Sequence, residues 1–327
     1  MVILYPSVKF SSNAIRLMNK PNFDPGLTQQ YSAEIKRVIR KDGQFNVRRH
    51  GTTWQDIHPY LFFLNAPWYV FLGFIVTGFI FVNLIFAGTY YLIGVQHLQG
   101  ADAPTEFGRF LDAFFFSSQT LTTVGYGTLA PRGSLVNLIA AFEAMIGLMG
   151  FAVVTGFLVG RVSRPTARIG FSDTMIVAPY QDGTSLQFRL VNRGVSNLME
   201  LQASVMLMTV VTSDGRQERK FERLELEREN VLFLALTWTI VHAIDANSPL
   251  FGKTAADLER LQAEVLILIK GTDDMFSQVV HARYSYRYDE IVWGAKFTPA
   301  FEIDDKGTMR LDVGKVSDHV KLPSLGS

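Results

Sequence analysis

Two long apolar segments stand out against an otherwise mixed pattern of hydrophobic and polar residues. No Asp, Glu, Lys or Arg occurs between Asp56 and Asp102, and residues 66–94 within this stretch are long enough to cross a bilayer as a helix. Residues 134–160 are also of spanning length, and Glu143 is their single charged residue. The pattern therefore predicts two transmembrane helices, at 66–94 and at 134–160.

A shorter apolar segment lies between the two predicted spans. Residues 110–121 (FLDAFFFSSQTL) are compatible with a helix but too short to span, which is typical of a re-entrant helix. The uncharged stretch TLTTVGYGTLAP, residues 120–131, continues from its end. Non-helical backbone at membrane depth is tolerated only where protein or a water-filled cavity satisfies its amides. The arrangement therefore predicts a pore.

The regions that flank the spans predict an orientation in the membrane. Residues 54–64 place apolar side chains on one helical face, which is typical of an interfacial helix along the cytoplasmic leaflet, although Pro59 would kink it unless it lies near an end. Basic residues flank both spans, so the positive-inside tendency predicts that both termini are cytoplasmic and that the protein is multi-pass in the cell's inner membrane. The basic flanks contain Lys36, Arg37, Arg40, Lys41, Arg48, Arg49, Arg161, Arg164 and Arg168.

The pattern changes after Pro165. Short alternating segments appear, such as Leu186, Phe188 and Leu190, with turn signals at 182–183 and 214–215. This alternation predicts an antiparallel β-sandwich of the immunoglobulin type. One clear helix is predicted at 254–263.

These elements predict a membrane α fold joined to a cytoplasmic β fold, in three parts. We expect a cytoplasmic N-terminal segment at 1–50, an interfacial helix and pore domain at 51–165, and a regulatory β-sandwich at 166–327. The two ends, residues 1–30 and 307–327, are expected to be weakly ordered extensions.

Composition and charge exclude several classes of function. The 327 residues include 31 basic and 30 acidic ones, a formal net charge of +1, so no global charge favours nucleic acid as a partner. There is no cysteine, and the six histidines lack metal-ligand spacing. No phosphate-binding or nucleophile motif occurs. We therefore expect neither an enzyme nor a cofactor.

Two glycines explain the TVGYG segment. Gly125 and Gly127 adopt backbone angles that other residues avoid, so successive carbonyls can point to one side of the strand. Four such strands around an axis make stacked rings of oxygens that replace the water shell of a potassium ion. The predicted K+ ligands are the carbonyls of Thr123, Val124, Gly125 and Tyr126 and the Thr123 hydroxyl. We also expect the Tyr126 side chain to brace the strand against the pore helix.

The order of these elements resembles the prokaryotic inward-rectifier potassium channels, the Kir/KirBac family. Two stretches of the second half carry the resemblance beyond the filter, VHAIDANSPLFG at 241–252 and GTDDMFSQVVHARYSYRYDEIVWGAKF at 271–297. The resemblance implies a homotetramer that conducts K+ passively and selectively, with K+ as the permeant ligand and no cofactor. It also implies that the β domain gates the cytoplasmic end of the second span.

The resemblance further implies roles for residues along the second span. We expect Gly147 and Gly156 to permit bending, although glycines in membrane helices also serve close packing. Phe151 stands where strong rectifiers of the family carry an acid that holds polyamines or magnesium, so weak block is expected. A constriction near Val159 could close by dewetting. The predicted pore-lining positions are Ala144, Phe151, Thr155 and Val159.

The arginines at the inner leaflet have two interpretations. Ordinary positive-inside topology explains them, and so does binding of anionic lipid headgroups. The family binds phosphoinositides at this level, which implies a lipid role for Arg161, Arg164 and Arg168. Arg48 and Arg49 would contribute from the amino-terminal side.

Residues near the filter leave alternatives open. Glu143 is expected to be a structural acid, hydrogen-bonded behind the filter. Thr128 follows GYG where many potassium channels have an acid, and Gln119 replaces a carboxylate that relatives often place behind the filter. A weakly selective cation channel is therefore one alternative. A membrane-anchored ligand-sensing protein is another, although an anchor does not require an intact TVGYG.

Overall fold

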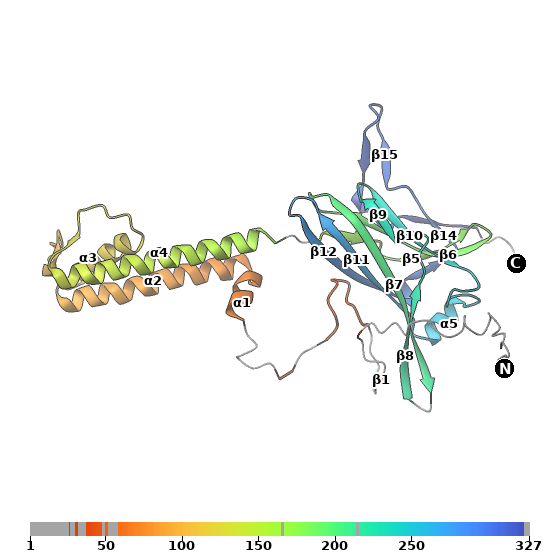
Figure 1. The fold of residues 1–327 in the computed structure, drawn as a ribbon, viewed down its shortest axis with the longest axis horizontal. Helices are drawn as coiled ribbons and strands as arrows, with labels where there is room; N and C mark the ends of the chain where they lie inside the picture. The colour runs from red at the N-terminus through yellow and green to blue at the C-terminus, as the bar shows by residue number, and fades with distance from the viewer. Residues whose placement is uncertain are drawn as a thin grey trace, which may run out of the picture. The chain divides into compact units, whose positions relative to one another are not determined.

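The computed structural model describes residues 26, 30–31, 37–47, 50–51, 58–164, 167–213 and 216–323. They belong to two compact units (Figure 1). The helical unit is Arg49–Arg164, and the β unit combines Met1–Arg48 with Pro165–Ser327.

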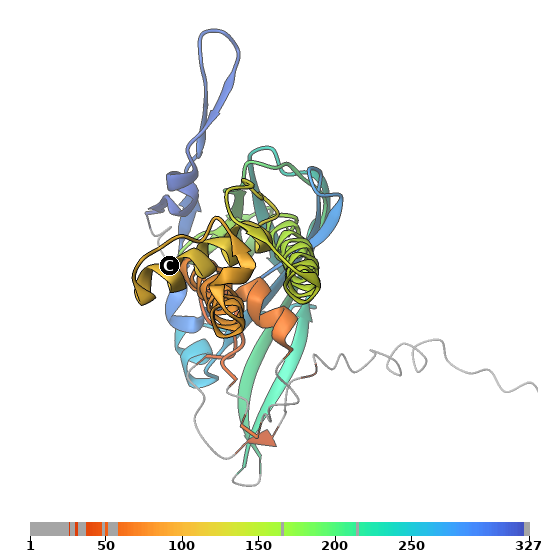
Figure 2. The same ribbon diagram turned by 90° about the vertical axis from the view of Figure 1, so that its left-hand side faces the viewer.

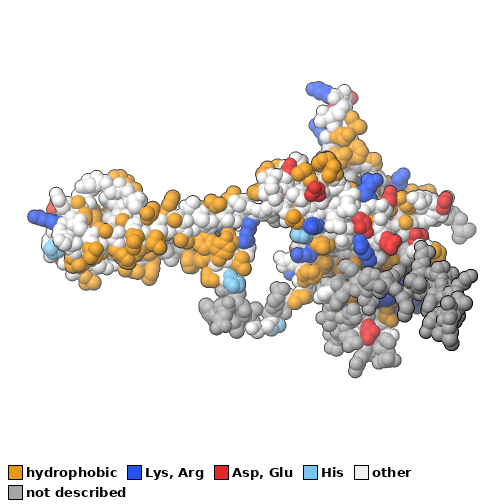
Figure 3. All heavy atoms as spheres, viewed as in Figure 1, with side chains coloured by type: hydrophobic (Ala, Val, Ile, Leu, Met, Phe, Trp, Pro, Cys, Tyr) orange, Lys and Arg blue, Asp and Glu red, His pale blue; other side chains and the backbone are white. Residues whose placement is uncertain are grey.

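Two long helices dominate the helical unit. α2 (Trp68–Ile93) has 26 residues, α4 (Ser134–Val162) has 29, and both are long and apolar enough to cross a membrane. They run side by side, and apolar side chains cover much of the visible surface of this unit (Figures 2 and 3). Within the single chain, 22% and 11% of their most apolar windows are buried, so most of both surfaces is left for lipid or for other copies. The two predicted spans are confirmed.

The helix between the spans begins earlier than the sequence predicted. α3 comprises Glu106–Leu121, because Thr105 caps its N-terminus by accepting a hydrogen bond from the Gly108 amide at 3.1 Å. Glu106 also places an acid in the first turn, where the helix dipole favours negative charge. The predicted start at 110 overlooked this capping signal.

A short helix precedes the first span. α1 comprises Pro59–Asn65 and begins at its proline, so Pro59 occupies a position where its missing amide costs nothing and no kink results. Residues 52–57, which include the predicted helix start at Trp54, lie outside the described residues.

The apolar core of the helical unit lies where α3 packs between α2 and α4. Its buried members come from all three helices and from the segment that follows α2: Ala87, Tyr90, Leu98, Ala113, Phe116, Val136 and Ala140. A two-residue ladder of β2 (Leu98–Gln99) with β3 (Ala130–Pro131) ties the loop after α2 to the segment that follows the filter. A 3-10 turn, Val95–His97, joins α2 to β2.

Two sheets, antiparallel except for one strand pair, build the β unit as a sandwich, as predicted. One sheet has the order β1 (Gln30–Tyr31), β8 (Arg216–Leu224), β7 (Leu198–Ser213), β11 (Glu264–Asp273) and β12 (Gln278–Arg287), with β9 (Asn230–Phe233) also on β7. The other has the order β10 (Thr237–Ile244), β6 (Gly183–Asn192), β5 (Met175–Tyr180) and β13 (Ile291–Trp293), with β4 (Ile169–Phe171) on β6. The β13–β5 pair is parallel.

The sandwich core follows from the alternation read in the sequence. Leu186, Phe188 and Leu190 of β6 are buried, and they share one cluster with Val265 and Ile267 of β11 in the opposite sheet. The predicted turn at 182–183 joins β5 to β6, where Tyr180 pairs with Gly183. The turn at 214–215 lies outside the described residues.

The C-terminal part contradicts one prediction. Residues 307–323 are not a weakly ordered extension, because β16 (Met309–Leu311) pairs with β15 (Phe301–Ile303), and β17 (His319–Lys321) pairs with β14 (Ala295–Phe297). The β15–β16 hairpin extends away from the sheets in Figures 1 and 2. Two 3-10 turns, Tyr288–Glu290 and Val313–Ser317, complete this region. The predicted helix at 254–263 is shorter, α5 (Ala255–Arg260), with Thr254 as its cap.

Candidate selectivity filter and pore

The backbone after α3 alternates between left-handed and other conformations. Thr123, Gly125 and Gly127 have φ values of 59°, 51° and 81°. Two of these positions are the glycines that the sequence singled out, whereas Thr123 adopts a conformation that is uncommon for a residue with a side chain. Alternation of this kind turns successive peptide groups so that like groups face one side.

The amides of the same segment turn back toward the pore helix. Val124 N and Gly125 N both donate to the Gln119 carbonyl, at 3.0 and 3.4 Å, and Thr123 N donates to the Thr120 carbonyl at 3.0 Å. The last turn of α3 thus supplies the acceptors for the strand.

The filter side chains find few partners within one chain. Val124 is 53% exposed and Tyr126 is 75% exposed. Within the single chain the Tyr126 side chain is mostly exposed, so its expected bracing contact with the pore helix stays a prediction for the assembled protein.

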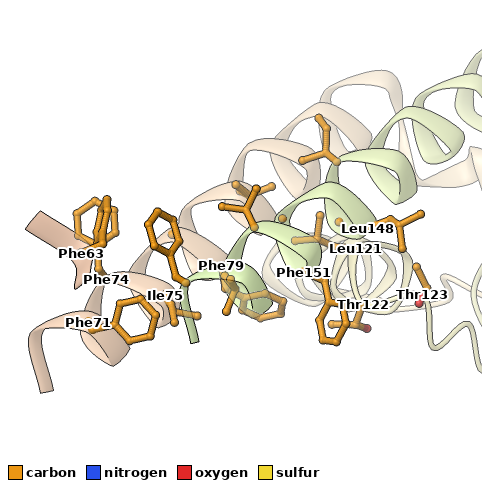
Figure 4. Close-up of a pocket in the computed structure, with 18 residues that line it drawn as sticks. Phe63, Phe71, Phe74, Ile75, Phe79, Leu121, Thr122, Thr123, Leu148 and Phe151 are labelled. Carbon is orange, nitrogen blue, oxygen red and sulfur yellow. The ribbon is translucent and has the colours of Figure 1, made fainter. Parts of the chain in front are cut away.

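An apolar cavity of about 860 Å³ lies below the filter in the helical unit. Thr122 and Thr123, at the base of the filter, line it together with Gly147 and Phe151 of α4 (Figure 4). Most of its other lining comes from apolar residues of α2 and α4. The base of the filter and the middle of α4 thus share one cavity wall.

The predicted pore-lining residues lie along one side of α4. Phe151, Thr155 and Val159 follow at intervals of one turn and are exposed in the single chain, and Ala144 is partly exposed. This side of α4 is therefore open in the single chain. The constriction near Val159 remains a prediction.

The two predicted hinge glycines have different surroundings. A Cβ atom at Gly147 would collide with the carbonyl oxygen of Leu121 at the end of α3, whereas Gly156 has nothing within 4 Å. Gly147 is therefore a close-packing site between α4 and the pore helix, a role that the sequence left as an alternative. Glu143, one turn earlier, is fully buried and is hydrogen-bonded to Tyr90 and Ser117, as expected of a structural acid.

The predicted lipid arginines do not act alike. The Arg161 guanidinium donates to the carbonyls of Phe63 and Ala66, the second at 2.6 Å, and lies 4.6 Å from the centre of the Trp68 ring. Arg164 donates to Asn65 Oδ1 at 3.0 Å. Arg168 belongs to the β unit and is exposed, and Arg48 and Arg49 lie outside the described residues. Arg161 is thus bound to the end of α1, which its place in a basic flank did not indicate.

A second set of basic residues holds the amino-terminal segment to the β unit. We call residues 37–47 the N-terminal latch. The Arg37 guanidinium donates to Glu290 Oε2 at 2.6 Å and to the Ser285 carbonyl at 2.5 Å, and Lys41 Nζ lies 2.8 Å from Glu290 Oε1. The Val38 amide donates to the buried carboxylate of Glu264 at 3.0 Å.

The latch also has an electrostatic signature. Burial raises the pKa of Glu290, but hydrogen bonds from Arg37 and Lys41 outweigh burial, so the pKa lies below its ordinary value. The hydrogen bond to Glu290 raises the pKa of Lys41. The sequence suggested only positive-inside topology for Arg37 and Lys41, because their acidic partner lies far along the chain.

Comparisons with known sequences cover both units. Residues 169–326 match the family described as inward rectifier potassium channel C-terminal domain, and residues 69–164 match the family described as ion channel. The chain is 35% identical over 287 residues to the inward rectifier potassium channel Kirbac3.1 of Paramagnetospirillum magnetotacticum, which covers 86% of this chain and 95% of that relative.

More distant relatives align over a similar share of the chain. It is 27% identical over 311 residues to the ATP-sensitive inward rectifier potassium channel 11 of Oryctolagus cuniculus, covering 88% of this chain and 79% of the relative. Among solved structures, the sporulation control protein Spo0M of Bacillus subtilis aligns with 43% of this chain and 61% of its own at 10% identity, and its TM-score of 0.22 is too low to carry an argument.

Proposed function

The chain belongs to the inward rectifier potassium channel family, and on that premise we propose that four copies form a pore that conducts K+ selectively through the TVGYG segment. Family membership confirms the expectation of an ion channel rather than an enzyme. It also confirms the resemblance stated from the sequence. With its two spanning helices, the protein is a membrane protein.

The observation that carries the proposal is the backbone of residues 123–127. Left-handed φ angles occur at every second residue, and the amides of residues 123–125 donate hydrogen bonds to carbonyls in the last turn of α3. Carbonyls that face away from the helix would form rings of K+ ligands when four strands meet around an axis. The ligands would be the carbonyls of Thr123, Val124, Gly125 and Tyr126, with the Thr123 hydroxyl at the inner entrance.

The tetramer is supported by what the single chain leaves exposed. Val124, Tyr126 and Phe151 are large apolar side chains, and each is more than half exposed although the filter and α4 lie at membrane depth. Neighbouring copies would cover Val124 and Tyr126. Phe151 would face the inner pore, together with Ala144, Thr155 and Val159.

Gating and orientation complete the proposal. The channel would close at the cytoplasmic end of α4 near Val159, under control of the β unit, with Gly156 as the proposed bending point and Gly147 as a close-packing site. Both termini would face the cytoplasm at the inner membrane. Anionic lipids or phosphoinositides would act on the basic residues Arg48, Arg49, Arg161, Arg164 and Arg168, of which Arg164 and Arg168 expose their side chains. No cofactor is required, because conduction is passive.

Tracer uptake tests the proposed conduction. Purified protein in liposomes loaded with KCl should take up rubidium in a barium-sensitive manner, and liposomes loaded with NaCl should not. Gly125→Ala should abolish uptake in an assembled tetramer, because Gly125 has a φ of 51° that disfavours a side chain. Gly73→Ala on α2 is the matched control, since Gly73 is exposed, nothing lies within 4 Å of a Cβ there, and its φ is ordinary. Equal uptake from both salts would indicate a weakly selective cation channel instead.

A further inference from the structure

A cluster of polar side chains is buried where α2, α3 and α4 meet. Asn83, Tyr90, Ser117 and Glu143 are each at most 1% exposed. The Tyr90 hydroxyl donates to Glu143 Oε2 at 2.7 Å. Ser117 Oγ contacts Glu143 Oε1 and lies 3.1 Å from Asn83 Oδ1. Both oxygens of the carboxylate therefore have partners, one on α2 and one on α3.

Burying such a cluster within membrane helices costs more free energy than joining the helices by apolar packing. Ionisable groups within a span are costly, and apolar packing joins helices without that cost. Hydrogen bonds differ from apolar packing in being directional, so they fix the distance and the rotation of the groups that they join. The cluster is thus suited to setting a position and not merely to holding the helices together.

A second contact between α3 and α4 lies one turn away from the first. Gly147 follows Glu143 by one turn of α4, and Leu121 follows Ser117 by one turn of α3. The carbonyl of Leu121 rests where a side chain at Gly147 would have to be. Glu143 with Ser117 and Gly147 with Leu121 therefore form two successive contacts that fix the register of the pore helix on α4.

The residue that holds the filter lies between these two contacts. The Gln119 carbonyl, which accepts from the amides of Val124 and Gly125, is flanked in the chain by Ser117 and Leu121. Any slide or rotation of the end of α3 moves this carbonyl and with it the filter backbone.

We infer that Glu143 and Gly147 are positioning residues for ion selection, because they hold the end of the pore helix where Gln119 keeps the filter amides in place. The inference rests on the proposed function and deepens it. It assigns selectivity in part to groups that do not touch the ion.

The test compares assembled variants by the ratio of rubidium to sodium uptake and by barium inhibition. Glu143→Leu removes both acceptors and Gly147→Ala pushes against Leu121, so each should lower the uptake ratio by about tenfold. Glu143→Gln should retain the wild-type uptake ratio, because the glutamine side-chain amide can accept a hydrogen bond from Tyr90 and donate one to Ser117. Gly73→Ala and Thr89→Val are the controls, because a Cβ at Gly73 has nothing within 4 Å and the Thr89 hydroxyl donates to the Ile85 carbonyl of its own helix.

The outcomes separate this inference from the proposed function. Wild-type uptake that does not distinguish rubidium from sodium rejects both. If wild-type uptake is selective and assembled Glu143→Leu and Gly147→Ala tetramers keep the same ratio of rubidium to sodium uptake, the inference alone is overturned. Such a result would mean that the two residues have a purely structural role, which alters tetramer yield and not the uptake ratio. Where Glu143→Leu does not assemble, the smaller changes Ser117→Ala and Tyr90→Phe take its place, and an unchanged ratio in both overturns the inference in the same way.

Discussion

Replacing Arg161 should release α1 from the end of α4. Its guanidinium donates to the carbonyls of Phe63 and Ala66, where the helix end leaves acceptors without partners. Hydrogen bonds that involve a charged group contribute about 1.5–3 kcal/mol each. Because the side chain is partly exposed, the lower value applies to both bonds, and Arg161→Gln should cost about 3 kcal/mol. That corresponds to about a hundredfold in the docking equilibrium of α1.

Hydrogen exchange of the α1 amides in lipid nanodiscs measures this equilibrium. Exchange should accelerate about a hundredfold in Arg161→Gln and less in Arg161→Lys, because an ammonium is a single point charge and lacks the planar fork. Arg164→Gln is the matched control, since Arg164 donates to an exposed side-chain oxygen of Asn65, and exposed polar pairs contribute little. Unchanged α1 exchange in Arg161→Gln would refute this account. If anionic lipid slowed α1 exchange in the wild type and not in Arg161→Gln, the result would instead favour a lipid-binding role for Arg161.

Two further predictions concern charge. Ionised Glu290 stabilises the N-terminal latch, and because its pKa is lowered in the folded protein, this contribution is present at neutral pH and is lost as the pH falls through the lowered pKa. After correction for the intrinsic exchange rate at each pH, hydrogen exchange of residues 37–47 should therefore become faster in acid. Glu290→Gln should remove this corrected pH response. A response in Glu290→Gln equal to that of the wild type would contradict the prediction. Phe151→Asp should introduce voltage-dependent spermine block in planar bilayers, whereas Phe151→Asn should not, and equal block of both would exclude charge as the cause.

The sequence predicted the features that depend on local pattern. Lipid imposes long uninterrupted apolar runs, so α2 and α4 could be read within a few residues of their ends. A strand with one face in a core must alternate, which is why Leu186, Phe188 and Leu190 identified β6. The left-handed angles at Gly125 and Gly127 were expected because few other residues adopt them.

The features that escaped prediction depend on distant partners. Arg37 meets Glu290 across 253 positions of sequence, and Ser117 meets Glu143 across 26. The sequence pattern shows that Arg37 lies in a basic segment and that Glu143 lies in a span, but it does not show which residues they contact. The backbone carbonyls that bind Arg161 carry no sequence signal at all. Strands as short as β16 and β17 likewise leave too few positions for alternation to show.

The glycines of α4 show how contacts decide between roles that the sequence could not separate. Gly147 and Gly156 both lie within the continuous apolar helix α4, and both were predicted as hinges. A bend at Gly147 would have to displace the Leu121 carbonyl and therefore the end of the pore helix, whereas Gly156 has open space around it. Gly156 also lies nearer the C-terminal end of α4, between Thr155 and Val159. Of the two, we therefore expect Gly156 to be the residue at which α4 bends to move Val159 while the filter stays in place.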